Sequence, residues 1–320
     1  MANTKKKIAV SSFWPLPEDF AADIAAVAPD YELVYLSDNP TDSQLAECEI
    51  IFGNVGADVR QKMPKLKWAH AQTAGVEIYL NPPLPNDVLL TNSSGAYGIA
   101  IAEHMLHFTL MLLRNATGYL SQQRKHIWKG IGRARNLNSC NVTVVGMGDI
   151  GGRYALLCHA MGAKVNGVVR TPRNDKPQCV EKLFTTDQLD DAIQDADIVA
   201  LALPGTGETT GILSRERLIS MKKGAFIINI GRGSAIDQDA LIELLQNGHI
   251  GGVGLDVTTP EPLPQDNPLW DMPNVIITPH VSHGGRGNTT GLVVDKFVRY
   301  LADYVNGRPF EREIDREAGY

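Results

Sequence analysis

Short, continuous apolar runs alternate with segments of helical spacing through the second half of the chain. Continuous runs of aliphatic and β-branched residues, bounded by turn residues, are typical of strands that are buried on both faces, as in parallel sheets. This alternation predicts an α/β unit built on a doubly wound parallel sheet. The strand-like runs lie at 142–145, 163–169, 197–203, 225–230, 251–255 and 275–277.

The start of the chain has a similar but separate alternation. Its strand-like runs lie at 8–10, 33–36, 49–52, 66–70 and 88–91. We expect a companion parallel α/β unit that has no phosphate-binding turn. The loop Thr73-Ala74-Gly75-Val76 follows the fourth of these runs. Its backbone N–H groups are suited to hold a carboxylate, which makes Ala74, Gly75 and Val76 candidate substrate contacts.

Two longer helical patterns complete the chain. The pattern at 98–124 is the longest and is apolar on more than one face, so we expect a buried helix between domains or subunits. His104 and His107 stand three residues apart in it, but no third ligand is spaced to join them, so we expect ordinary packing and no metal site. The pattern at 288–306 predicts a closing helix that crosses back to the first unit.

A glycine-rich turn follows the run at 142–145. It reads Gly146-Met147-Gly148-Asp149-Ile150-Gly151 and precedes a helical pattern at 153–161. In this context the first glycine permits a tight turn, the second lets a pyrophosphate approach the backbone, and the third lets helix and strand pack closely. The helix N-terminus then attracts the anion. We therefore expect residues 146–150 to contact a dinucleotide; the alternative is an ordinary glycine-rich turn.

The next strand-like run ends in arginine. NAD-binding chains usually carry an acid about twenty residues after the glycine turn, where it binds the ribose hydroxyls. That position holds Arg170, followed by Thr171 and Arg173. A carboxylate would repel a 2′-phosphate, whereas guanidinium groups can pair with it. The sequence therefore predicts NADP(H) as the preferred cofactor, with NAD(H) still possible; solvated surface arginines are the alternative.

Other candidate cofactor contacts fall where the remaining strand-like runs end. Ligands of parallel α/β sheets bind at the carboxyl ends of the strands, and the segments found there are rich in glycine and polar residues. The predicted contacts outside the glycine turn are Leu203, Pro204, Thr209, Ile230, Gly231, Arg232, Asp256 and His280.

Composition narrows the class of partner. A chain of 320 residues is long enough for two domains, each with its own core. The formal net charge of −6 argues against nucleic acid and anionic membranes as partners. No apolar run approaches the length of a membrane span. The four cysteines, Cys48, Cys140, Cys158 and Cys179, form no C-x-x-C pair, so we expect reduced thiols in a cytoplasmic protein.

Several segments together resemble one enzyme family. Arg232 lies in I-N-I-G-R-G-S-A-I-D-Q-D-A-L, Glu261 in D-V-T-T-P-E-P-L-P and His280 in I-T-P-H. With V-G-M-G-D-I-G, A-Q-T-A-G-V-E and T-N-S-S-G-A-Y-G in the expected order, they resemble the D-isomer-specific 2-hydroxyacid dehydrogenases. The arginine-ended strand and A-Y-G-I-A-I-A-E-H look most like the NADPH-dependent glyoxylate, hydroxypyruvate and broad 2-ketoacid reductases.

This resemblance implies an architecture. It implies two Rossmann-like domains with a cleft between them, and usually a homodimer. The substrate-binding (catalytic) domain would be discontinuous, made of 1–97 and 286–320. The dinucleotide-binding domain would span 98–285.

The resemblance also implies roles for single residues. Arg232 would bind the substrate carboxylate and carbonyl, His280 would be the acid/base, and Glu261 would be its partner. Gly75 and Val76 would lie at the substrate carboxylate, and Asp256 near the nicotinamide carboxamide.

One segment departs from the family pattern. The family mostly carries small residues after the histidine, whereas this chain reads Val281-Ser282-His283-Gly284-Gly285-Arg286. His283 is therefore a candidate substrate contact that reshapes the site or adds a polar group. The alternative is a solvated loop histidine.

The predicted activity is NADPH-dependent reduction of a small 2-ketoacid, of the glyoxylate or hydroxypyruvate type, to an (R)-2-hydroxyacid by hydride transfer. One alternative is an NAD-dependent dehydrogenase of the 3-phosphoglycerate type, although the segment 72–77 has no basic residue for a phosphate. Another is a non-enzymatic, dinucleotide-sensing scaffold like the corepressors built on this fold. The chain lacks the basic arms and disordered tails expected of that role.

Overall fold

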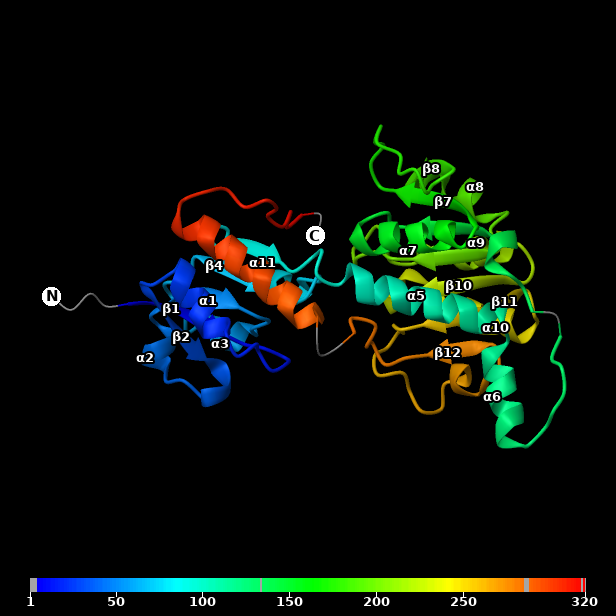
Figure 1. Ribbon diagram of the computed structural model, residues 1–320, viewed down its shortest axis with the longest axis horizontal. Coiled ribbons are helices and arrows are strands. Elements are labelled where there is room, and N and C mark those ends of the chain that lie inside the picture. The colour runs from blue at the N-terminus through cyan, green and yellow to red at the C-terminus, as the bar shows by residue number, and fades with distance from the viewer. Residues whose placement is uncertain (1–4, 133, 285–287, 318, 320) are drawn as a thin grey trace. The chain divides into compact units, whose positions relative to one another are not determined.

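The computed structural model describes residues 5–132, 134–284, 288–317 and 319. They form two compact units, each with its own parallel sheet (Figure 1). The first unit holds the chain up to Tyr97 and the closing segment, and the second holds Gly98–Gly284. The predicted domain boundary at 285/286 lies outside the described residues. The α/β class with two parallel sheets is confirmed.

The first unit contains a five-stranded sheet in the order β2-β1-β3-β4-β5. All of its strand pairs are parallel. The strand order reverses between β1 and β3, so the carboxyl ends of these two strands form the switch point of the sheet. Its strands are β1 (Lys6–Val10), β2 (Tyr31–Tyr35), β3 (Cys48–Phe52), β4 (Trp68–Ala71) and β5 (Leu89–Asn92). Its helices are α1 (Phe20–Val27), α2 (Asp42–Leu45), α3 (Ala57–Arg60), α4 (Glu77–Leu80) and α11 (Asn288–Val305), with a 3-10 turn at Leu36–Asp38.

Helix α11 returns to this unit through aromatic packing. Phe297 stacks on Phe52 of β3, with ring centroids 4.4 Å apart, and on Trp68 of β4 at 5.4 Å. All three side chains are fully buried. Burial of these large aromatic groups stabilises the packing of α11 on the sheet. The helix also packs against α1 (Figure 1).

The second unit contains a seven-stranded sheet in the order β12-β11-β10-β9-β6-β7-β8, again with parallel pairs. Its switch point lies between β6 and β9. Its strands are β6 (Asn141–Val145), β7 (Lys164–Val169), β8 (Lys182–Thr185), β9 (Ile198–Leu201), β10 (Ala225–Asn229), β11 (Ile250–Leu255) and β12 (Val275–Ile277). Its helices are α5 (Gly98–Leu113), α6 (Ala116–Arg124), α7 (Asp149–Ala160), α8 (Leu189–Ile193), α9 (Arg215–Ser220) and α10 (Gln238–Gln246). Short 3-10 turns occur at Leu137–Ser139, Thr186–Gln188, Gly233–Ala235 and Pro268–Asp271.

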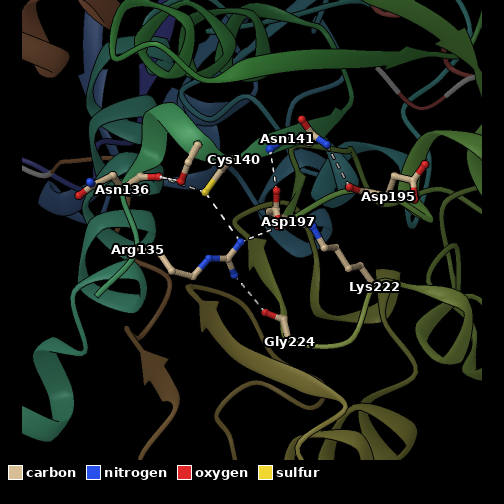
Figure 2. Close-up of polar contacts among 9 residues, drawn as sticks. Arg135, Asn136, Cys140, Asn141, Asp195, Asp197, Lys222 and Gly224 are labelled. Carbon is tan, nitrogen blue, oxygen red and sulfur yellow. Dashed lines mark hydrogen bonds and ion pairs between the residues drawn. The ribbon is translucent and has the colours of Figure 1, made fainter. Parts of the chain in front are cut away.

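A buried carboxylate ties together the amino ends of three central strands of this sheet (Figure 2). Asp197, which is 5% exposed, accepts hydrogen bonds from Arg135 at 2.6 Å, from Lys222 at 2.7 Å and from the Asn141 backbone N–H at 2.9 Å. Burial opposes ionisation of Asp197, but the contacts with Lys222, Asn141 and Arg135 outweigh it, so its pKa is lowered. This edge is opposite to the one where ligands of such sheets bind.

The helix predicted at 98–124 is two helices, so that expectation was wrong. The chain breaks between α5 and α6 at Asn115, whose φ is +53°. Asparagine adopts this left-handed conformation more readily than most residues, and its side chain donates to the Ile131 carbonyl at 3.0 Å. Of these two helices, only α5 has buried side chains. With 16 residues, α5 is also shorter than α11, which has 18.

The sequence prediction missed the edge strand β8 and helix α8 that follows it, as well as the short helices α3, α4 and α9. The side chains of β8 are only exposed or half-buried, so no continuous apolar run marks it. In the part of the chain that the structure describes, no helix combines the length and apolar character needed to cross a membrane.

Candidate functional site

The glycine turn lies between β6 and α7, at the switch point of the seven-stranded sheet. Gly146 has a φ of +98°, and a Cβ atom there would lie 2.4 Å from the Ala202 carbonyl oxygen. Gly151 packs against the same turn, because its Cβ would lie 1.9 Å from the Gly146 carbonyl oxygen. A Cβ on Gly148 would meet nothing within 4 Å, so this side of the turn is open. An anion therefore has a path to the backbone at the N-terminus of α7.

The side chains of this turn differ in burial, and none of them is described on the open side of Gly148. Met147 is buried, and the Asp149 carboxylate accepts from Arg153 Nε at 2.7 Å, one turn further along α7. Ile150 is half-buried. The open side at Gly148 thus presents backbone, as a pyrophosphate site requires.

The arginine segment follows directly after β7. Arg170 and Thr171 are both exposed. Arg173 Nε lies 3.7 Å from Asp175 Oδ1, whose side chain is 83% exposed. A surface pair of this kind contributes little stability, so Arg173 can exchange its partner for a stronger anion.

The loops after β9 and β10 are held by their own side chains. Thr209 Oγ1 donates to the Pro204 carbonyl at 2.7 Å and accepts from the Thr206 N–H at 2.9 Å, which closes the loop that follows Leu203. After β10, Ile230 is buried and precedes Gly231.

Asn229 at the end of β10 braces Arg232. Its Oδ1 accepts from the Gly231 N–H at 3.1 Å, and its Nδ2 donates to the Arg232 carbonyl at 2.9 Å. Arg232 Nη1 also donates to the Gly231 carbonyl at 2.8 Å. The sequence motifs did not point to Asn229; the available signal was a polar residue at the end of an otherwise apolar run.

Asp256 organises the segment that carries His280. Its side chain is fully buried and accepts from Thr278 Oγ1 at 2.6 Å, from the Val281 N–H at 2.9 Å and from the Ser282 N–H at 3.0 Å. Burial opposes ionisation, but the hydrogen bonds from Ser282, Thr278 and Val281 outweigh it and lower the pKa of Asp256. The carboxylate is therefore charged at neutral pH and fixes the loop after β12. Its expected contact with a nicotinamide carboxamide stays a prediction.

The structure brings His280 and Glu261 together. His280 Nδ1 lies 2.9 Å from Glu261 Oε2, and both side chains are partly exposed. The other oxygen of Glu261 accepts from the Thr258 N–H at 3.2 Å. Gln238 on α10 holds the same loop by two hydrogen bonds with the Thr259 backbone, at 2.7 and 3.1 Å.

The Arg232 segment packs directly against the Glu261 loop. A Cβ on Gly233 would lie 2.0 Å from the Thr258 carbonyl oxygen. The residue after Arg232 therefore touches the residue whose N–H binds Glu261. All three predicted catalytic residues belong to this one unit.

Two further histidines lie near Asp256. His104 Nε2 is hydrogen-bonded with Thr278 Oγ1 at 3.0 Å, and burial lowers the pKa of His104 although Asp256 opposes the shift. His283 is half-buried in a turn that the Gly284 N–H closes on the Val281 carbonyl at 3.2 Å. Burial lowers the pKa of His283 too, against the effect of Asp256. Gly285 and Arg286 lie outside the described residues.

The candidate substrate loop, residues 73–76, belongs to the first unit and follows β4. Asn92 Nδ2 donates to the Ala74 carbonyl at 2.5 Å, and Thr73 Oγ1 donates to the Gly75 carbonyl at 2.6 Å. Val76 is fully buried. The carbonyl groups of Ala74 and Gly75 thus accept hydrogen bonds from side chains.

The second unit therefore combines a dinucleotide-type turn with a histidine–carboxylate pair and a braced arginine. That combination defines a nucleotide-dependent oxidoreductase of the parallel α/β class. The sequence profile of the NAD binding domain of the D-isomer specific 2-hydroxyacid dehydrogenases matches residues 106–282. The chain belongs to this family of oxidoreductases, as the sequence motifs predicted.

Similar proteins agree with this assignment. A putative 2-hydroxyacid dehydrogenase of Haemophilus influenzae is 32% identical over 75% of this chain and 80% of that protein. Glyoxylate/hydroxypyruvate reductase B of Pectobacterium atrosepticum is 31% identical over 79% of this chain and 81% of that protein. The crystal structure of an NADPH-dependent glyoxylate/hydroxypyruvate reductase from Sinorhizobium meliloti, with NADP and sulfate, has a TM-score of 0.86, 28% identity, and coverage of 99% of this chain and 100% of that chain.

Proposed function

We propose that this protein is an NADPH-dependent reductase of 2-ketoacids, of the glyoxylate/hydroxypyruvate type, that produces (R)-2-hydroxyacids. The observation that carries this proposal is the 2.9 Å hydrogen bond between His280 and Glu261, at the strand ends of a dinucleotide-type sheet. The names of relatives from Pectobacterium and Sinorhizobium support the substrate class.

The second unit's residues fit a dinucleotide. The open face of Gly148 at the start of α7 suits a pyrophosphate, and Arg170 and Arg173 suit a 2′-phosphate better than a free ribose hydroxyl. We therefore propose NADP(H) over NAD(H). When bound, the reduced nicotinamide supplies the hydride that adds to the carbonyl carbon.

The protein's own residues handle the charge and the proton. The Arg232 guanidinium is permanently charged and would hold the substrate carboxylate, with the carbonyl oxygen beside it. It then stabilises the negative charge that grows on this oxygen as the hydride arrives. Because Glu261 engages Nδ1 of His280, Nε2 is left to donate a proton to the oxygen. The product is a 2-hydroxyacid, and His280 is left neutral.

We propose that the N–H groups of Ala74, Gly75 and Val76 hold the substrate carboxylate as well. His283 is a further polar group on the substrate side. The protein would act as a homodimer in the cytoplasm, with the exposed apolar residues Tyr119, Leu120, Ile127 and Trp128 as the contact region. The four cysteines, all buried and free, suit a reducing compartment.

The test is the loss of NADPH absorbance when purified protein is mixed with glyoxylate or hydroxypyruvate. We expect turnover that falls by at least about a hundredfold in His280→Ala. Turnover of 3-phosphohydroxypyruvate with NADH instead would favour the 3-phosphoglycerate-type dehydrogenase. Tight dinucleotide binding without turnover of any ketoacid would favour a sensing scaffold.

A further inference from the structure

We propose that Phe13 and Trp14 form a subsite for the substrate side chain, and that the enzyme therefore also reduces 2-ketoacids with branched or aromatic side chains. This inference rests on the proposed function. It concerns only the first unit, in which the substrate loop 73–76 also lies.

The two aromatic residues stand at the switch point of the first unit's sheet. They lie three and four residues after the end of β1, and ligands of sheets with the order 2-1-3-4-5 bind where β1 and β3 end. Gly53, just after β3, approaches this segment so closely that a Cβ would lie 1.7 Å from the Ser11 carbonyl oxygen. The segment after β1 is thus packed into the switch point.

The aromatic surface is exposed at this point. The Phe13 side chain is 62% exposed, and its ring lies edge-on to Trp14, with centroids 6.0 Å apart. Burial of a large apolar side chain is usually favourable. The exposed ring of Phe13, packed against the half-buried Trp14 beside a ligand-binding edge, therefore suits an apolar ligand group.

Gln72 holds this segment and the substrate loop in one hydrogen-bond network. Its side chain is fully buried; Oε1 accepts from the Phe13 N–H at 3.1 Å, and Nε2 donates to Ser12 Oγ at 3.0 Å. Its backbone N–H donates to Asn54 Oδ1 at 3.0 Å, and Asn54 Nδ2 donates to Thr73 at 2.8 Å. The backbone of Phe13 is therefore fixed by the residue that precedes Thr73.

The spacing of the strands sets the size of ligand. Strand β3 alone separates β1 from β4, so the two loops begin about 10 Å apart, which is two inter-strand spacings. A carboxylate on residues 74–76 leaves room for a branched or aromatic group that reaches toward Phe13. Glyoxylate carries only a hydrogen in place of that group and cannot use the aromatic pair.

The experiment compares kcat/KM for phenylpyruvate, 4-methyl-2-oxopentanoate and glyoxylate in wild type, Phe13→Ala and Phe13→Leu. We expect wild type to reduce all three. In Phe13→Ala, kcat/KM should fall roughly ten- to hundredfold for the two bulky substrates and change little for glyoxylate, because an apolar contact of this size discriminates by that factor. Phe13→Leu should recover part of the loss.

Trp270→Ala is the matched control. Like Phe13, Trp270 is an aromatic residue with an exposed side chain, but it belongs to the second unit and lies before β12, at the amino end of that strand. It should leave all three values unchanged. Reduction of glyoxylate alone by wild type, or an equal fall for all substrates in Phe13→Ala, would overturn the subsite and leave the proposed function standing. Absence of turnover with every ketoacid would remove the proposed function itself, and the subsite with it.

Discussion

The imidazole of His280 and the carboxylate of Glu261 are joined through Nδ1 and Oε2 at 2.9 Å, although 19 residues separate them in the chain. Different elements bring them there. His280 follows β12, and its backbone N–H donates to the Asp256 carbonyl at 2.8 Å. Glu261 lies in a loop that Gln238 of α10 holds by two hydrogen bonds. The pair is therefore prepositioned by the fold, with the ring oriented by the carboxylate.

Glu261→Gln tests whether the charge of this carboxylate matters as well as its position. Glutamine keeps a hydrogen-bond acceptor for the ring but removes the negative charge that stabilises a protonated imidazole. We expect kcat for ketoacid reduction to fall about ten- to hundredfold while KM changes less, as measured by steady-state kinetics. Glu243→Gln, on the exposed face of α10, should leave both constants unchanged. An unaltered kcat in Glu261→Gln would remove Glu261 from the proton-transfer step.

Asp256→Asn should weaken both stability and turnover. The two carboxylate oxygens accept from Val281, Ser282 and Thr278, and an amide NH₂ group in place of one oxygen would face a donor. Leaving such a buried donor unpaired costs about 1–3 kcal/mol, which urea unfolding would detect. Because the loop of His280 is released, kcat should also fall. Asp271→Asn, at an exposed position, is the control; equal effects of the two substitutions would contradict this account.

The cofactor prediction has its own variant. Arg170→Asp restores the acid that NAD-binding chains carry at the end of the second strand, and it adds a charge that repels a 2′-phosphate. We expect wild type to have the higher kcat/KM with NADPH, and the variant to shift the NADPH/NADH ratio at least about tenfold toward NADH. Lys164→Asp, at the exposed start of the same strand, should leave the ratio unchanged. A wild-type preference for NADH would end the prediction.

Much of both sheets was predictable from sequence, because buried parallel strands are continuous apolar runs. The failures have physical causes. Lys182-Leu183-Phe184-Thr185 forms an edge strand without a buried face, so it has no such signature. The break at Asn115 depends on a single left-handed φ within a stretch whose apolar spacing continues past it.

The site was predictable only in part. Motifs predicted His280, Glu261 and Arg232 as site residues and paired His280 with Glu261, but they gave no indication of what holds the segments that carry them. The buried acceptors Asn229 and Asp256 act through backbone donors, and any residue can supply those donors. Their role therefore becomes visible only when the chain is folded.

The buried carboxylate of Asp197 should stabilise the second unit in a pH-dependent way. Arg135 and Lys222 remain partly exposed, with side-chain exposures of 34% and 49%, which screens their attraction. We therefore expect Asp197→Asn to cost about 1–3 kcal/mol at pH 7. Since the pKa of Asp197 is lowered in the folded protein, the unfolded chain takes up its proton first, and the stabilisation is lost as the pH falls below about 4. Urea unfolding at pH 7 and near pH 3 should show the gap between wild type and variant closing; a constant gap would mean that the charge contributes nothing.

Because of the buried His70 on β4, we expect the first unit to lose stability in acid. The ring of His70 is fully buried between Thr91 Oγ1, at 2.7 Å, and Ser93 Oγ, at 3.1 Å. Burial lowers the pKa of His70 to about 3, and Lys296 adds to the shift. Below about pH 6.5, His70 binds a proton in the unfolded chain but stays neutral in the folded unit. The free energy of unfolding should therefore fall by up to about 1.4 kcal/mol for each unit by which the pH is lowered.

The variant His70→Gln separates this effect from general acid destabilisation. Glutamine does not titrate, so the slope of unfolding free energy against pH between about 5 and 6.5 should decrease by up to about 1.4 kcal/mol per pH unit, the contribution of one proton. Urea unfolding followed by tryptophan fluorescence measures this slope. His159→Gln, at an exposed position near the end of α7, removes a histidine that no burial protects and should leave that slope nearly unchanged. If both variants keep the wild-type slope, the buried ring is not what makes the first unit sensitive to acid.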